Sequence, residues 1–258
     1  MSVVSSAINL GLRQPVELVT QKLNICPETA VSCLNQEDPC CVPDMGKMTM
    51  AVQWVLSKPV LNFTIHGFWP GECSTGVGPL EGCQIGRTNP KTDIESRPEL
   101  KEEMEKYWVS DEDDDHWLWK HEWNIHGTCL STVREECPLG KEEGPPHIRY
   151  FKATLRQYEQ LDVYDELKNN NIIPRMEPYS KREIVSALGR WAQSFQLVCL
   201  SGRLTQIHFF RLGKAGNEFI DRLFSGTHKC PQKIGYYPKL TQLNSAGKPI
   251  VTHSGESV

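Results

Sequence analysis

The stretch KMTMAVQWVLSKPVLNFTIHGFWP (47–70) decides the fold. Two runs within it, KMTMAVQWVL (47–56) and LNFTIH (61–66), are short, apolar or alternating, and bounded by Gly and Pro, which is typical of β-strands. We expect the second strand to end at the histidine, where a glycine turn follows. Much later in the chain, RLTQIHFFRL (203–212) has the same character and predicts a further strand.

Three longer and more charged segments predict helices. SRPELKEEMEKYW (96–108) has Pro98 suited to a first turn, IRYFKATLRQYEQLDVYDEL (148–167) repeats apolar residues on one face, and a third segment begins at Ser180, which can cap it together with Glu183. Strands and helices mix without regular β-α-β alternation. The pattern therefore favours an α+β fold with a mainly antiparallel central sheet flanked by helices.

The 258 residues are enough for one large domain. Residues 1–22 have no cysteine and no clear amphipathic period, so we expect a loosely attached N-terminal arm. The body runs over 23–240, and the small polar residues of 241–258 predict a flexible C-terminal tail. No run approaches the ~20 apolar residues of a membrane span, so we expect no membrane insertion.

Ten cysteines, an even number, occur without any C-x-x-C pair. This pattern favours disulfides over zinc ligands or free thiols, and disulfides indicate an oxidising compartment. Spacing alone leaves about 945 pairings open. The opening MSVVSSAINLGLRQP lacks the basic start and unbroken apolar stretch of a signal peptide, so we expect a leader removed or replaced, or another export signal.

Lys and Arg number 28 against 32 Asp and Glu, a formal net charge of −4 with neutral histidines. This near balance excludes a protein that binds long stretches of phosphate backbone tightly at neutral pH.

The segment WKHEWNIHGTC (119–129) places two histidines and a glutamate within a short span. The zinc-protease motif H-E-x-x-H sets its imidazoles on one helix face, but five residues separate His121 from His126 here, a rotation of about 140° on a continuous helix. We therefore expect the rings to diverge too far for one metal ion, and we expect no metal and no cofactor. The acidic run DEDDD (111–115) lacks EF-hand spacing and predicts a solvated loop.

On that same helix, His121, Glu122 and His126 fall on a single arc that can line a cleft opposite His66. Such a set suits cleavage of an RNA phosphodiester: one group takes the 2′-hydroxyl proton, another protonates the departing 5′-oxygen, and donors stabilise the phosphorane. Imidazole titrates near pH 6.5 and can serve in either role. The remaining histidines are expected to be core or surface residues: His116, His147, His208, His228 and His253.

The segments FTIHGFWP (63–70) and WKHEWNIHGTC (119–129) resemble the two active-site signatures of the ribonuclease T2 family of secreted acid endoribonucleases. Both occur in order, about 50 residues apart, and the similarity covers 23–240. The resemblance implies that His126 is the general base and His66 the general acid.

By the same resemblance, His121 binds the phosphate and Glu122 polarises the phosphate or holds the base. Trp69 stacks on a nucleobase, an interaction of ~1–3 kcal/mol that needs no charge. The other aromatic side chains of the two segments are expected in the core: Phe63, Trp119 and Trp123.

The cysteine pattern, including CPETAVSCLNQEDPCC (26–41), resembles the fungal members. The resemblance implies five bridges: Cys26–Cys41, Cys33–Cys73, Cys40–Cys137, Cys83–Cys129 and Cys199–Cys230.

Three positions depart from the family pattern. Ile125 stands where a lysine usually precedes the second catalytic histidine, and Lys120 lies about 170° away from the centre of the arc on a continuous helix. Gly71 replaces an acidic residue after the proline, and Phe68 replaces a leucine. The loss of the lysine predicts a slower enzyme, because one charge-assisted contact contributes ~1.5–3 kcal/mol.

The leading hypothesis is a metal-independent, secreted or vacuolar–lysosomal endoribonuclease that cleaves single-stranded RNA through a 2′,3′-cyclic phosphate with low base specificity. The alternative is a secreted RNase-like binding protein or effector with weak or no catalysis, because Ile125 replaces the lysine. We expect a monomer without an obligate protein partner. Asn62-Phe63-Thr64 is an N-glycosylation sequon, four residues before His66, so Asn62 is a candidate glycosylation site. If all eight histidines are protonated at acidic pH, the net charge becomes +4.

Overall fold

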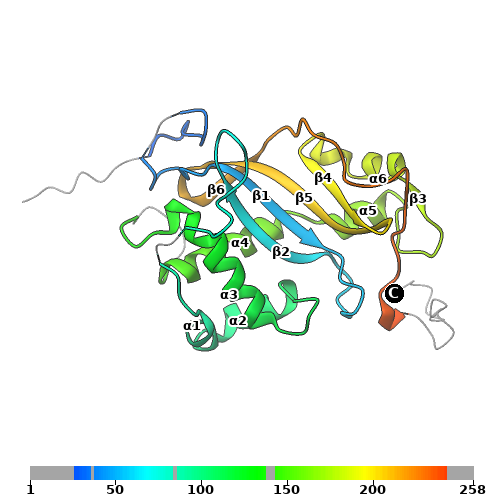
Figure 1. Cartoon of the computed structure of the whole chain (residues 1–258), viewed down its shortest axis with the longest axis horizontal. Coiled ribbons are helices and arrows are strands. Elements are labelled where there is room, and N and C mark those ends of the chain that lie inside the picture. The colour runs from blue at the N-terminus through cyan, green and yellow to red at the C-terminus, as the bar shows by residue number, and fades with distance from the viewer. Residues whose placement is uncertain (1–25, 36–37, 84–85, 138–142, 243–258) are drawn as a thin grey trace, which may run out of the picture.

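The computed structural model describes residues 26–35, 38–83, 86–137 and 143–242, and Figure 1 shows their arrangement. The predicted arm, 1–22, and nearly all of the predicted tail, 241–258, lie outside these residues. Among the described residues, no helix is long and apolar enough to cross a membrane.

A twisted antiparallel sheet forms the centre of the molecule (Figure 1). Its strand order is β2-β1-β5-β4, and β6 pairs with the far end of β5. The strands are β1 (Lys47–Gln53), β2 (Thr64–Gly71), β4 (Phe195–Leu200), β5 (Arg203–Lys214) and β6 (Glu218–Asp221). A separate two-stranded sheet pairs β3 (Tyr179–Ser180) with β7 (Lys233–Ile234).

The helices lie behind the sheet and beside its β2 edge (Figure 1). They are α1 (Lys91–Glu95), α2 (Pro98–Tyr107), α3 (Asp115–Ile125), α4 (Pro146–Glu159), α5 (Val163–Asn169) and α6 (Lys181–Ala187). Short 3₁₀ turns occur at Gly127–Cys129, Ser131–Val133, Gly189–Trp191, Ala215–Asn217 and Leu240–Gln242. The α+β fold with a mainly antiparallel sheet is thereby confirmed.

Two helix predictions have different outcomes. Ser180 caps α6 in a reciprocal capping box with Glu183, as predicted. The single helix predicted over 148–167 is wrong, because the chain turns between α4 and α5. The turn buries Leu161 and Val163 in the core, and this packing overrides the helical pattern.

The strand that carries His66 does not end there, contrary to the predicted glycine turn. β2 continues to Gly71, and Pro70 is tolerated because β2 is an edge strand. Ala51 pairs with Gly67 and Val52 pairs with Ile65, so His66 is the extra residue of a β-bulge.

Alternate residues of the strands form an apolar core against α4. Met50, Phe68 and Phe209 are fully buried, and so is Tyr150 of α4. The Tyr150 hydroxyl donates a hydrogen bond to the Phe68 carbonyl oxygen over 2.9 Å, which fixes β2 against the helix.

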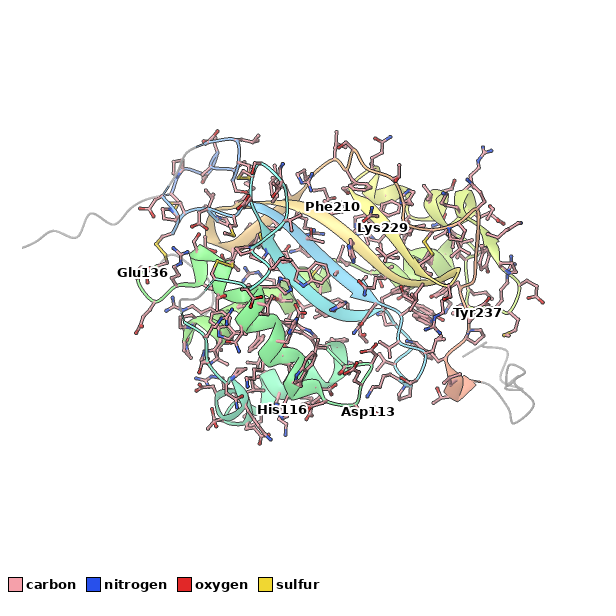
Figure 2. All side chains as sticks on the ribbon, in the orientation of Figure 1. Asp113, His116, Glu136, Phe210, Lys229 and Tyr237 are labelled. Atoms are coloured by element: carbon pink, nitrogen blue, oxygen red, sulfur yellow. A yellow bond between two sulfur atoms is a disulfide. The ribbon has the colours of Figure 1, made fainter. Side chains whose placement is uncertain are left out.

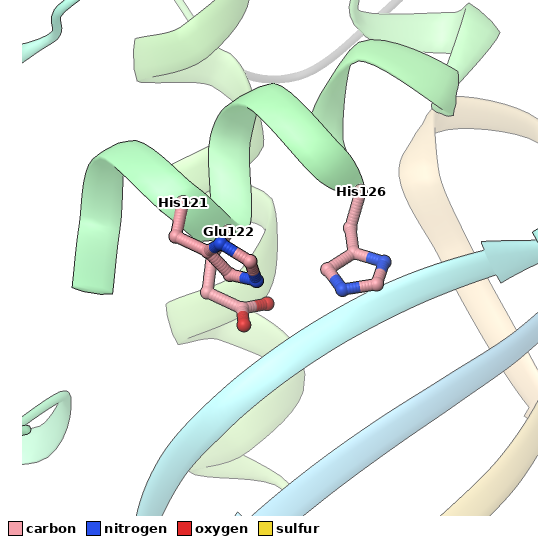
Figure 3. Close-up of side chains that lie close together, drawn as sticks. All are labelled: His121, Glu122 and His126. Carbon is pink, nitrogen blue, oxygen red and sulfur yellow. The ribbon is translucent and has the colours of Figure 1, made fainter. Parts of the chain in front are cut away.

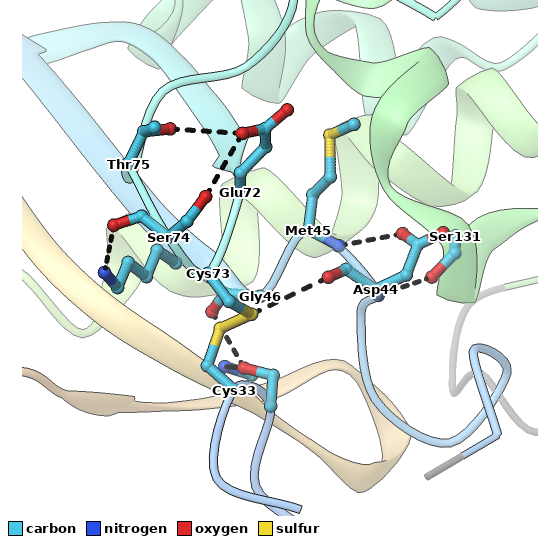
Figure 4. Close-up of a disulfide and its surroundings, with 12 residues drawn as sticks. Cys33, Asp44, Met45, Gly46, Glu72, Cys73, Ser74, Thr75 and Ser131 are labelled. Atoms are coloured by element: carbon cyan, nitrogen blue, oxygen red, sulfur yellow. Dashed lines mark hydrogen bonds between the residues drawn. A yellow bond between two sulfur atoms is a disulfide. The ribbon is translucent and has the colours of Figure 1, made fainter. Parts of the chain in front are cut away.

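All five disulfides that the family resemblance implied are present: Cys26–Cys41, Cys33–Cys73, Cys40–Cys137, Cys83–Cys129 and Cys199–Cys230. Figure 4 shows Cys33–Cys73, which ties the first described segment to the loop after β2. Beside it, the Asp44 backbone N–H donates to the Ser131 hydroxyl over 3.1 Å. Three of the bridges, Cys26–Cys41, Cys33–Cys73 and Cys40–Cys137, therefore hold the first described segment in place.

Candidate active site

The bulge in β2 aims His66 toward the same side of the sheet as Gly67 and Trp69. Its backbone is held in place by the Trp108 indole N–H, which donates to the His66 carbonyl oxygen over 2.9 Å. Bulges commonly re-aim a side chain next to an active site. The bulge therefore places a half-buried imidazole at the edge of the sheet that faces α3.

The N-terminal end of α3 is fixed by local capping and by an indole. Asp114 caps the helix by accepting from the Trp117 backbone N–H over 2.8 Å. The Trp119 indole donates to the Trp108 carbonyl oxygen over 2.8 Å, so one tryptophan pair links α3 to the end of α2. Part of the acidic run thus caps a helix, although 111–114 are exposed as the solvated-loop prediction required.

The C-terminal end of α3 is fixed by Gly82, Cys83 and Thr88. Asn124 exchanges two hydrogen bonds with the backbone of Thr88, and Cys83–Cys129 bridges the same region. A Cβ on Gly82, whose φ is +66°, would lie 2.7 Å from the Ile125 carbonyl oxygen, so only glycine permits this close approach.

α3 ends at Ile125, and His126 departs from helical geometry with φ −117°. This departure brings potential ligand atoms of His121, Glu122 and His126 within 4.8 Å of one another (Figure 3). The prediction that the two rings diverge was wrong, because it assumed a continuous helix. These three side chains therefore have the geometry to hold a metal ion.

Glu122 is the buried centre of the site. Its Oε2 accepts a hydrogen bond from the Trp69 indole over 2.8 Å, and its Oε1 lies 3.9 Å from His66 Nε2. Burial raises the pKa of Glu122 to about 8, although the Trp69 hydrogen bond opposes this. The carboxyl group is therefore neutral at acidic pH and can donate a hydrogen bond through its free oxygen.

Gly67 makes room for this hydrogen bond. A Cβ at position 67 would lie 1.9 Å from Glu122 Oε2 and 2.3 Å from Trp69 Nε1. Any larger residue would separate the indole from the carboxyl group.

We call the space between β2 and α3 that Trp69, Glu122 and the three histidines border the cleft. The pKa values of His66, His121 and His126 are all lowered, because these imidazoles are removed from water and His126 lies near the other two. Burial, with smaller contributions from neighbouring His121 and His66, lowers the pKa of His126 to about 3. Burial also lowers the pKa of His66, although Gln206 and Asp111 partly offset it, and burial lowers the pKa of His121. A bound anion would favour the imidazolium forms.

These shifts correct the charge expected at acidic pH. The value of +4 required all eight histidines to be protonated. His126 and His208 each have a pKa of about 3, so both are neutral at pH 4 to 5. At acidic pH the protein is therefore less cationic than its composition suggests.

His208 belongs to the cleft, although the sequence suggested a core or surface residue. It lies on β5 opposite Ala51, its ring lies 5.2 Å from the Trp69 ring, and its Nε2 is 2.7 Å from Gln206 Oε1. The available signal was its position in an alternating strand, two residues from Gln206 on the same face.

Trp69 occupies the middle of the histidine cluster. Its ring centroid lies 5.2 Å from His66 and 5.3 Å from His126. The exposed Trp117 stacks in parallel on His121, with ring centroids 5.2 Å apart, and sequence reasoning missed this contact. Phe63, Trp119 and Trp123 are buried, as predicted.

The histidines outside the cleft have structural partners. His147 Nε2 lies 3.0 Å from Asp93 Oδ2, and His116 Nε2 lies 3.2 Å from Glu95 Oε1. His228 Nδ1 accepts from the Leu197 backbone N–H over 3.2 Å. His253 lies outside the described residues. Ion pairs and backbone contacts thus account for these imidazoles, whereas no ionised carboxylate touches the cleft histidines within the described chain.

Three further residues that the sequence singled out, Ile125, Lys120 and Asn62, also take defined places. Ile125 is half-buried at the last turn of α3, between His121 and His126, and Lys120 is exposed. Asn62 is half-buried before β2, where its side-chain oxygen accepts from the Phe63 backbone N–H over 2.8 Å.

A model of the ribonuclease T2 family matches residues 26–230. The chain belongs to the ribonuclease T2 family. Ribonuclease Rh of Rhizopus niveus is 32% identical over 223 residues, covering 83% of this chain and 92% of that protein. Ribonuclease T2 of Aspergillus oryzae is 31% identical over 198 residues and covers 72% of each. The chain spans only 55% of the ribonuclease T2-like protein of Emericella nidulans.

The crystal structure of Actibind, a T2 ribonuclease, superposes with a TM-score of 0.75 and 26% identity, covering 83% of this chain and 98% of that one. RNase NT in complex with 5′-AMP gives a TM-score of 0.55 and 25% identity, covering 75% and 98%. Membership of this family supports a ribonuclease that cleaves RNA.

Proposed function

We propose that this chain is an endoribonuclease that cleaves single-stranded RNA by transphosphorylation to 2′,3′-cyclic phosphate ends, without a metal ion and with low base specificity. One observation carries the proposal: five side chains from β2 and the end of α3 lie close together, namely His66, Trp69, His121, Glu122 and His126. These residues include three imidazoles, one more than the two that a mechanism with one proton acceptor and one proton donor needs.

His126 is proposed as the general base. Its low pKa keeps it neutral above about pH 3, so its free nitrogen can accept the 2′-hydroxyl proton in acidic solution. His66 is proposed as the general acid that protonates the departing 5′-oxygen. The phosphodiester anion favours its protonated form when substrate is bound.

Glu122 and His121 are proposed to hold the phosphate. The neutral carboxyl of Glu122 offers a hydrogen-bond donor, and its Oε1 lies 3.9 Å from His66 Nε2. A phosphate bound beside both groups would accept this hydrogen bond as negative charge develops on the phosphorane. This donor partly replaces the lysine that is absent at Ile125. Trp69 is proposed to stack on the base of the nucleotide whose 2′-hydroxyl faces His126; RNase NT, a relative, is described in complex with a nucleotide, 5′-AMP.

The mechanism predicts an acidic pH optimum. Activity falls as pH drops below the His126 pKa of about 3, because the base is then protonated. It also falls as pH rises through the pKa of His66, which lies below 6.5, because the acid is then deprotonated. The expected profile of kcat/KM is a bell with both limbs below pH 6.5.

The test is cleavage of a homopolymer RNA in EDTA between pH 3 and 7, with His66→Ala as the control. Cyclic phosphate ends and unchanged rates in EDTA support the proposal. Loss of activity in EDTA, restored by zinc, would instead assign His121, Glu122 and His126 as metal ligands. Equal rates for wild type and His66→Ala would refute the role of His66.

The alternative function is an RNase-like binding protein or effector, and Ile125 is the observation that favours it. It predicts that wild type binds RNA but does not cleave it. We further propose a monomer that acts in the secreted or vacuolar compartment and carries a glycan on Asn62. Native mass spectrometry of the protein from a secreting host tests the subunit number and the glycan together.

A further inference from the structure

A second aromatic cluster lies on the cleft side of the sheet. Thr49 of β1 pairs with Trp69 on one side and with Phe210 on the other. Residues paired across neighbouring strands point to the same face, so these three side chains form one row. With strands about 4.8 Å apart, the Cα atom of Phe210 lies about 10 Å from that of Trp69.

Phe210 is part of a fixed, half-exposed platform, which we define as Phe210, Arg222 and Phe224. The Phe224 ring stacks on the Phe210 ring with centroids 4.6 Å apart, and the Arg222 guanidinium lies 5.2 Å from the Phe210 centroid. Backbone hydrogen bonds hold the segment, since the Arg222 N–H donates to Phe210 over 2.9 Å and the Phe224 N–H donates to Gln193 over 2.6 Å.

Among the described residues, no carboxylate forms an ion pair with the Arg222 guanidinium of the platform. Within the described residues, the Arg222 guanidinium donates only to the Leu223 carbonyl oxygen at 3.3 Å, and its buried Nε has no partner. The neighbouring Asp221 is directed to Arg211, with 3.6 Å between Oδ1 and Nε.

A second cation borders the same surface. Lys229 is exposed beside β4, close enough to His208 to lower its pKa, and it has no carboxylate partner in the described part of the chain. Figure 2 labels Phe210 and Lys229 beside β5 and β4. Aromatic rings flanked by unpaired cations are the chemistry that binds a base by stacking and its phosphate by charge.

We propose that the Phe210 platform binds the nucleotide immediately 5′ of the one stacked on Trp69. This inference rests on the proposed function, which places the nucleotide with the attacking 2′-hydroxyl between Trp69 and His126. The departing nucleotide then lies toward His66 and Gln206. Along β5, Gln206 and Phe210 lie on opposite sides of His208, which pairs with Ala51. An RNA chain whose 3′ part lies toward Gln206 therefore has its 5′ part toward the platform.

The experiment compares kcat/KM for a dinucleotide, the same dinucleotide extended by one 5′ nucleotide, and the same dinucleotide extended by one 3′ nucleotide. Wild type is expected to favour the 5′-extended substrate about tenfold over the dinucleotide, the contribution of one stacked base. In Phe210→Leu/Phe224→Leu this ratio is expected to fall to about 1. Arg222→Gln and Lys229→Gln are expected to reduce it partly and to flatten its dependence on salt.

Two matched controls separate the platform from general effects. Leu223→Gln changes an exposed apolar residue between the platform residues, and Arg182→Gln removes an exposed cation on α6, behind the sheet. Both should retain the wild-type ratio. A ratio that persists in Phe210→Leu/Phe224→Leu, or a gain that follows the 3′ extension instead, would overturn the proposal.

Binding of uncleavable 2′-deoxy trinucleotides, followed by tryptophan fluorescence, keeps the test independent of catalysis. If wild type cleaves no RNA, the proposed function fails, yet weaker binding of the 5′-extended ligand to the Phe210→Leu/Phe224→Leu variant would still support the platform. Equal binding of the 5′-extended ligand by the variant and the wild type would overturn the platform proposal.

Discussion

Met50 of β1 and Phe209 of β5 pair on the face of the sheet that packs against α4, and the next pair along the same strands, Ala51 and His208, lies on the face that borders the cleft. Both members of the first pair are apolar and fully buried. The second places a methyl group beside an imidazole with a pKa of about 3.

The difference teaches how one sheet serves two purposes. Period-two alternation lets the back face supply the apolar burial that stabilises the fold, while the front face holds polar and aromatic groups close together. Those groups stay only partly solvated, because α3 closes over the β2 edge, and this partial burial shifts their pKa values. Substitutions on the two faces should therefore change different quantities.

The largest effect is expected on the cleft side, from the proposed proton-transfer groups. His126→Ala and His66→Ala should each lower kcat about 10²- to 10⁴-fold, because each removes one proton-transfer partner. Single-turnover cleavage at pH 5 measures this loss, and thermal unfolding should show little change.

His116→Ala is the matched control, because His116 pairs with Glu95 outside the cleft. It should retain wild-type kcat. A comparable loss in His116→Ala would mean that imidazole removal acts through stability rather than through chemistry.

The back face should respond in stability instead. Phe209→Ala should lower the free energy of unfolding by about 3–5 kcal/mol, because it leaves a cavity in the core. Its neighbour in sequence, Phe210→Leu, faces the cleft side and should lower it by less than about 1.5 kcal/mol. Urea unfolding with the disulfides intact measures both values, and equal losses would contradict the two-face description.

Much of this contrast could be predicted from the sequence. The strands 47–56 and 203–212 alternate strongly enough to predict the sheet, and Ser180 with Glu183 predicts the start of a helix. Each of these signals involves residues that are close together in the sequence, so it can be recognised without knowledge of the fold. The five disulfides came from the resemblance, because loop lengths alone do not select among pairings.

Most of the missed features depend on distant residues, although the stacking of Trp117 on His121 is a local contact within α3. His208 joins the cleft because β1 places it next to Trp69, and no local pattern reveals which front-face histidine has such a neighbour. The approach of His126 to His121 depends on where α3 ends, and Gly82 and Thr88 contact the chain at that end. The break between α4 and α5 depends on the burial of Leu161.

Glu122 offers a test of burial at the cleft itself. Below pH 4.5 both the folded and the unfolded states hold its proton; between 4.5 and 8 the unfolded state releases it while the folded state retains it. Wild-type stability should therefore fall as pH rises through this window. Glu122→Gln removes this dependence, so at pH 7 it should be more stable than wild type by about 3 kcal/mol.

Denaturant unfolding of both proteins at pH 4 and pH 7 measures the difference. Glu81→Gln, an exposed change of the same type, controls for the loss of one negative charge. A Glu122→Gln advantage that is equal at both pH values would mean that the carboxyl is already ionised in the folded protein.

The smallest expected effect concerns Ile125, the residue on which the binding-protein alternative rests. Ile125 lies between His121 and His126, so Ile125→Lys introduces a cation at the edge of the cleft, where the neutral Glu122 carboxyl offers only one donor. A charge-assisted contact to the phosphorane should raise kcat about 10- to 100-fold with little change in KM. Lys120→Gln is the control and should leave kcat unchanged, because Lys120 is exposed. Activity that appears only in Ile125→Lys would favour the binding-protein alternative, whereas an unchanged kcat would mean that Glu122, His66 and His121 already supply the full stabilisation of the transition state.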